Sequence, residues 1–83
     1  MKIFKEPTWQ FEVAGEEGNT ILFGVNIFNF EWIDTSKKAI VYDPIYNQQY
    51  RFPIYDIEIK GVKHQFAAKE FSNCVWGFYT FKY

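Results

Sequence analysis

Large apolar residues recur at every second position over most of this chain, and turn-forming residues interrupt them at intervals of about eight to twelve residues. Residues 55–60 are the clearest case, because Tyr, Ile and Ile alternate there with Asp, Glu and Lys. Successive side chains of a strand point to opposite faces, so this alternation predicts half-buried strands. Helical periodicity is weak throughout. The pattern predicts an all-β fold, a small antiparallel meander of six to seven strands that is closed into a barrel or folded as a sandwich.

The length of 83 residues indicates one domain covering residues 1–83. A chain this short buries only about 60–65% of the surface that its unfolded form exposes, so each large side chain contributes heavily to stability. Aromatic residues make up 23% of the chain, and the apolar fraction of 48% excludes a disordered chain.

The most hydrophobic run, ILFGVNIFNFEWI at 21–33, changes face at its centre. Its large residues occupy odd positions up to Ile27 and even positions from Phe28 onward. A straight strand over residues 20–33 would span about 46 Å, whereas a globule of this size is only about 30 Å across. A tight turn at Asn26-Ile27 would force a positive φ on a β-branched residue. We therefore expect a β-bulge at Asn26 or Ile27, with Phe23 and Phe28 both buried.

Other segments give local expectations. Lys60-Gly61 is a plausible two-residue hairpin turn. Pro53 cannot donate to a ladder, so it marks an edge, a bulge or a break. Residues 67–73 fit a hairpin loop better than one helical turn. Residues 74–81 are apolar on both faces, so we expect this strand to be paired on both sides. An early strand of the same chain is favoured over a second chain as its partner.

Charge and cysteine content narrow the class of protein. The formal net charge is −1 and no basic stripe is present, which argues against affinity based on phosphate neutralisation and hence against nucleic acid as a partner. A single cysteine, Cys74, allows no intrachain disulfide. No apolar stretch reaches the length of a signal peptide or a membrane span. We expect a cytoplasmic protein that does not enter a membrane.

Two pairs of residues are candidate catalytic groups. His64 and Cys74 would be same-face neighbours on the last hairpin if residue 66 paired with residue 74. Asp56 and Glu58 share a strand face at a separation of about 6–7 Å, which fits an inverting glycosidase pair. A solvated strand face and a small buried cysteine explain the same residues more simply. We therefore expect no enzyme activity, no catalytic residues, no metal site and no cofactor.

The segment YDPIYNQQYRFPIY at 42–55 has the composition of a recognition surface, because tyrosines alternate there with amides and the chain's one arginine. Its candidate partner-binding residues are Tyr46, Gln48, Tyr50 and Arg51. We expect Tyr46, Tyr50 and Arg51 to be accessible and to share one surface. The alternative is that these tyrosines cap a barrel rim, with the rings inward and the hydroxyls in water.

These observations predict a non-catalytic small β module that binds a protein partner or self-associates, as a homodimer, through an aromatic-rich surface. The alternative function is small-ligand or carbohydrate binding in the mouth of the barrel. A deep apolar pocket with converging polar groups would favour the ligand. A tyrosine patch at a sheet edge would favour the protein partner.

Overall fold

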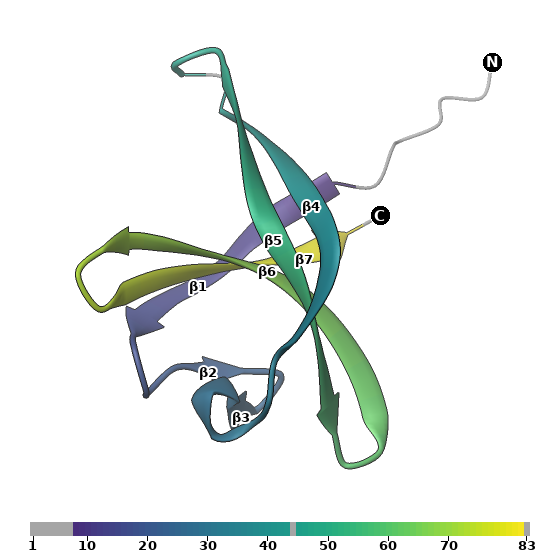
Figure 1. Cartoon of the computed structure of the whole chain (residues 1–83). Helices are drawn as coiled ribbons and strands as arrows, with labels where there is room; N and C mark the ends of the chain where they lie inside the picture. The colour runs from purple at the N-terminus through teal and green to yellow at the C-terminus, as the bar shows by residue number, and fades with distance from the viewer. Residues whose placement is uncertain (1–7, 44, 83) are drawn as a thin grey trace, which may run out of the picture.

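The computed structural model describes residues 8–43 and 45–82, in which seven strands and one 3-10 helix occur (Figure 1). The elements are β1 (Thr8–Glu16), β2 (Ile21–Leu22), β3 (Val25–Asn26), η1 (Ile27–Asn29), β4 (Ile33–Asp43), β5 (Gln48–Ile59), β6 (Val62–Ser72) and β7 (Val75–Lys82). No helix in these two ranges is long and apolar enough to cross a membrane.

Five of the strands form one antiparallel sheet in the order β1-β7-β6-β5-β4, and β2 and β3 form a separate small hairpin. The strands β4 to β7 follow one another as a meander, and β1 returns to pair with β7. The all-β, antiparallel meander is therefore confirmed, as is the pairing of β7 on both sides by strands of its own chain. No ladder joins β1 to β4 within the described ranges, so no closed barrel is found.

The sheet carries a core on each of its two faces. The first core is larger and is made of Leu22, Ile27, Ile57, Ile59, Phe66, Ala68 and Phe78. The second core is made of Ala39, Phe52, Ile54 and Ala67. The strand β5 supplies both, because its even-numbered residues near Phe52 and its odd-numbered residues near Ile57 point to opposite faces. The segment between β1 and β4 covers only the first core (Figure 1).

The expected bulge at Asn26 or Ile27 is wrong. The chain turns three residues earlier, at Phe23-Gly24, where both residues have positive φ (57° and 79°) and Leu22 pairs with Val25. The 3-10 helix η1 then follows and changes the face that the side chains present. Phe23 is large for a left-handed position, but its ring stacks on His64 with centroids 4.4 Å apart. This stacking contact offsets part of the free-energy cost of the positive φ at Phe23.

Asn26 holds this segment together through its side-chain amide. Its Oδ1 accepts from the backbone N–H of Thr20 (3.3 Å) and of Phe28 (3.2 Å), and its Nδ2 donates to the carbonyl of Gly18 (3.1 Å). The bond from Phe28 is the N-cap of η1. Ile27 is thereby fixed in the first core with no exposed surface.

Two further expectations concern the hairpin turns. The Lys60-Gly61 turn is confirmed, since both residues have positive φ (52° and 79°) between β5 and β6. The expected loop at 67–73 is wrong, because β6 continues to Ser72 and the turn is Asn73-Cys74. The register shift between Phe11 and Val13 in β1 is a bulge that the alternating sequence did not reveal.

A candidate binding groove where the sheet divides

The ladder between β5 and β6 covers only part of each strand. It runs from the pair Ile54–Ala67 to the pair Ile59–Val62. Beyond Ile54, the remaining part of β5 pairs only with β4, and beyond Ala67 the remaining part of β6 pairs only with β7. Figure 1 shows the β4–β5 hairpin and the β6–β7 hairpin diverging from this point. Pro53, which has no N–H to donate, stands immediately before the pair Ile54–Ala67, where this ladder stops.

The outer parts of β4 and β5, residues 39–43 and 48–52, form a two-stranded extension that we call the β4–β5 arm. One face of the arm continues the second core through Val41, Tyr50 and Phe52. The opposite face carries Ile40, which is 55% exposed and pairs with the exposed Arg51. The arm therefore has one aromatic face directed toward β6 and β7 and one face directed to solvent.

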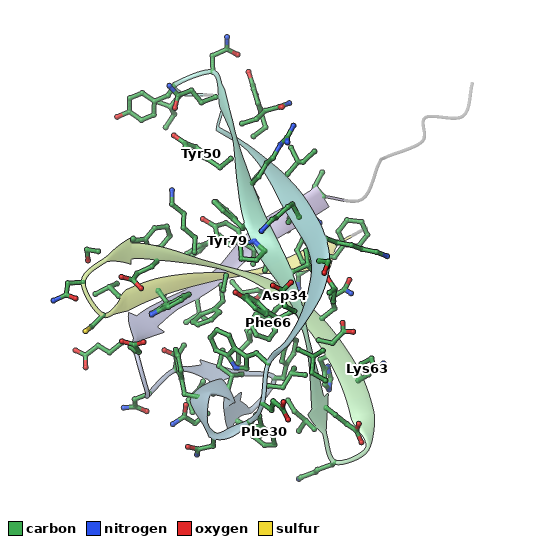
Figure 2. All side chains as sticks on the ribbon, in the orientation of Figure 1. Phe30, Asp34, Tyr50, Lys63, Phe66 and Tyr79 are labelled. Carbon is green, nitrogen blue, oxygen red and sulfur yellow. The ribbon has the colours of Figure 1, made fainter. Side chains whose placement is uncertain are left out.

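A groove of about 360 Å³ lies where the arm and the β6–β7 hairpin separate. Figure 2 labels Tyr50 on the arm and Tyr79 nearer the point where the strands cross. Between them is Phe52, whose ring centroid lies 4.9 Å from that of Tyr79 and 6.3 Å from that of Tyr50. The residues that line the groove are Val41, Tyr42, Tyr50, Phe52, Lys69, Phe71 and Tyr79.

Lys69 crosses this groove from β6 toward β5. Its Nζ lies 4.5 Å from the ring centroid of Tyr50, 5.4 Å from that of Phe52 and 5.9 Å from that of Phe71. Cation–π contacts of this kind contribute about 0.5–2 kcal/mol each, depending on how far water is excluded. A lysine side chain thus spans the gap where the backbone ladder has ended.

Two aromatic side chains extend the groove toward β1. Phe71 is 47% exposed and lies 6.4 Å, centroid to centroid, from Phe11, which is 54% exposed. Phe11 in turn meets Tyr79 edge to face at 5.6 Å. Exposed rings in one place are unusual for a side of a protein that contacts only water.

The polar groups of the groove are hydroxyls rather than carboxylates. The Tyr50 hydroxyl donates to Oε1 of Gln48 (3.0 Å). Burial raises the pKa of the Tyr79 hydroxyl above its ordinary value of 10.0, so Tyr79 stays neutral at pH 7. Of the described residues that line the groove, Lys69 alone has a formally charged side chain.

The structure separates the four residues that the sequence suggested. Gln48 and Tyr50 lie on the groove side of the arm, and Tyr46 lies in the exposed turn at its tip. Arg51 follows Tyr50 in a strand and therefore points to the opposite face, so the expectation that these two share one surface is wrong. The sequence reasoning missed Lys69, Phe71 and Tyr79. Lys69 and Phe71 are two positions apart in AAKEF (67–71), so interpreting this segment as a strand would have placed both on one face.

The structure does not bring His64 and Cys74 together. His64 stacks on Phe23, whereas Cys74 lies in the turn at the other end of β6, because Ala67 pairs with Tyr79 rather than residue 66 with residue 74. Asp56 accepts a hydrogen bond from Gln65 (3.1 Å) as an ordinary cross-strand pair. No cluster of three or more His, Cys, Asp or Glu side chains suited to a metal ion occurs in the part of the chain that the structure describes.

Comparison with known proteins gives no assignment, because no protein family, no curated protein and no solved structure matches this chain.

Proposed function

We propose that the chain is a non-catalytic binding module whose aromatic groove takes up an extended segment of a partner protein. The observation that carries this proposal is the parting of β5 and β6 at Ile54 and Ala67. Each hairpin then has a strand edge on the groove side with no ladder partner among residues 8–43 and 45–82. An unpaired strand edge is a template for another extended chain.

The edge of β5 suits an added strand better than that of β6. Residues 48–52 pair with β4 in unbroken register, whereas the outer part of β6 has a register shift between Glu70 and Ser72. A regular edge presents backbone donors and acceptors at an even spacing, which an extended segment matches along its length. The proposed segment therefore lies along β5, with alternate side chains against the rings of the groove.

Backbone groups and aromatic rings would make different contributions to recognition of the segment. Backbone hydrogen bonds give affinity to any extended chain, and side-chain pockets select among chains. Tyr50, Phe52 and Tyr79 supply rigid apolar surface at low entropic cost, as tyrosines do in other recognition surfaces.

Selection from a displayed library of random nine-residue peptides, followed by N-methyl scanning of the selected peptide, tests this proposal. In a strand added to an edge, every second N–H faces that edge. N-methylation should therefore abolish binding at alternate peptide positions and leave binding unchanged at the positions between. Selection of no peptide, or a methylation profile without this period of two, would contradict the proposal.

Matched variants test whether the peptide binds in the groove. Tyr50→Ala removes a ring from the groove face of the arm, and Arg51→Ala removes an exposed side chain from the other face of the same strand. The first should weaken peptide binding and the second should not. Thermal melts of both variants confirm that each is folded. Light scattering shows whether a second copy of the chain, rather than a different protein, occupies the groove.

Small-ligand or carbohydrate binding is a second candidate, supported by the volume of the groove. About 360 Å³ lies at the lower end of the range of about 300–1,000 Å³ that small-molecule sites occupy. Such a ligand would use the rings and not the edge of β5. Monosaccharide titration monitored by tryptophan and tyrosine fluorescence, with Tyr50→Ala as the groove variant, distinguishes it from the peptide.

A further inference from the structure

Lys69 has the one formally charged side chain among the described residues that line the groove. It pairs with Gly77 across the β6–β7 ladder, so the residue directly opposite it has no side chain. The stem runs over the second core, and the ammonium group reaches Tyr50 on the far side of the groove. The charge is thus held in the middle of the groove rather than at its rim.

The ring centroids of Tyr50, Phe52 and Phe71 lie 4.5, 5.4 and 5.9 Å from the nitrogen of this ammonium group. An ammonium group has three N–H donors, and ring faces satisfy the charge without accepting strong hydrogen bonds. Among the side chains that the structure describes, no carboxylate forms an ion pair with Lys69. The ammonium group is therefore a ready donor to an acceptor that enters the groove.

Charge complementarity then indicates what a bound segment carries. The lining is otherwise neutral, and Lys69 gives it a positive charge within a protein whose formal net charge is −1. A carboxylate that reaches Lys69 forms a charge-assisted hydrogen bond in a partly desolvated place, whereas a lysine or arginine there meets a like charge. Side chains two positions before and after it lie on the same face of an extended segment. These flanking side chains would rest on the rings of Phe52 and Phe71.

We propose, on the basis of the function proposed above, that the groove selects partner segments with a glutamate or aspartate facing Lys69 and apolar residues two positions to either side. The pattern is apolar-x-acidic-x-apolar in an extended chain. Lys69 is the residue that determines this specificity. The rings of Tyr50, Phe52 and Phe71 position its ammonium group, and those of Phe52 and Phe71 receive the flanking side chains.

The test is the same displayed library of random nine-residue peptides, selected in parallel on the wild type and three variants. Lys69→Met keeps an apolar stem of similar length without the charge, and Lys69→Glu reverses the charge. Lys63→Met is the matched control, because Lys63 is an exposed lysine on the same strand, beside the β5–β6 turn and away from the groove (Figure 2). A synthetic peptide with the wild-type consensus and its counterpart with glutamine in place of the acidic residue are then titrated.

The wild type and Lys63→Met should both enrich the acidic pattern, and the glutamine counterpart should bind roughly tenfold more weakly. Lys69→Met should bind both peptides equally, and Lys69→Glu should enrich lysine or arginine at the same position. Wild-type peptides that show the period-two methylation profile but no acidic residue would overturn this inference and leave the proposed function standing. A wild type that selects no peptide would overturn both.

Discussion

The ring of Phe71 lies directly over the backbone of Gly77, so that a Cβ added to Gly77 would overlap the Cε2 and Cζ atoms of the ring. Gly77 is buried although it has no side chain, because Phe71 on the neighbouring strand covers it. A glycine weakens a strand because it is flexible and has no side chain to pack. A cross-strand aromatic ring that covers the glycine compensates for both effects. This contact keeps Phe71 beside the groove.

Gly77→Ala should therefore displace the ring of Phe71 and destabilise the protein by about 1 kcal/mol, since the half-exposed ring can move away rather than force the strands apart. Urea denaturation measures the loss. In the Phe71→Ala background the same substitution should be neutral or stabilising, because the collision is absent and alanine is less flexible than glycine. Equal losses in both backgrounds would show that the ring does not lie over Gly77.

Asn26→Ala should cost about 2 kcal/mol of stability, because it removes a cap of η1 and leaves the N–H groups of Thr20 and Phe28 without their acceptor. Asn26→Asp keeps an acceptor at the same place and should recover part of the loss. Asn29→Ala, at an exposed position of the same 3-10 helix, is the control and should change stability little. A loss for Asn29→Ala equal to that for Asn26→Ala would contradict the role given to Asn26.

Removal of residues 77–83 should unfold the domain. The strand β7 lies between β1 and β6, and it carries Phe78, which has no exposed surface. Loss of such side chains at about 1.5–3 kcal/mol each, together with two ladders, exceeds the margin of about 5 kcal/mol expected for a small domain. Circular dichroism and a thermal melt of the truncated chain decide the matter. A cooperative melt would mean that β7 is dispensable to the core.

Alkaline pH should destabilise the protein through Tyr79. Burial raises the pKa of this hydroxyl in the folded state, so its contribution is fully present below the unfolded value near 10 and is lost as the pH rises through the folded value. The free energy of unfolding of Tyr79→Phe should therefore fall less between pH 9 and pH 11 than that of the wild type. Burial and the nearby Asp34 raise the pKa of Tyr55 too, so some loss should remain in this variant. If the free energy of unfolding of Tyr79→Phe depended on pH in the same way as that of the wild type, Tyr79 would not be the cause of the loss at alkaline pH.

The sequence predicted the strands well where the alternation is regular and the turn residues are strong. The hairpin at Lys60-Gly61 and the two-sided pairing of residues 75–82 both follow from local patterns. The turn at Phe23-Gly24 does not, because a bulky residue at positive φ is disfavoured until His64, distant in the sequence, stacks on it. Contacts with residues distant in the sequence therefore determine where this segment turns.

Part of the groove could be anticipated from the sequence. Of the residues that line it, Tyr42, Tyr50 and Phe52 belong to a stretch whose composition suggests recognition, whereas Lys69 and Phe71 lie in a segment that resembles a loop. Which tyrosines face the groove depends on where the β5–β6 ladder ends. That end is set by strand register between distant segments, and local patterns leave register open where polar and apolar residues are mixed.

Amide hydrogen exchange measured by NMR on residues 48–52, in the free protein and with the selected peptide bound, tests the open edge of β5 most directly. In the free protein, amides directed toward β4 should exchange slowly and those directed toward the groove should exchange fast, in alternation along the strand. The bound peptide should slow the second set and leave the first unchanged. Uniform protection in the free protein, or no change when the peptide binds, would contradict the account.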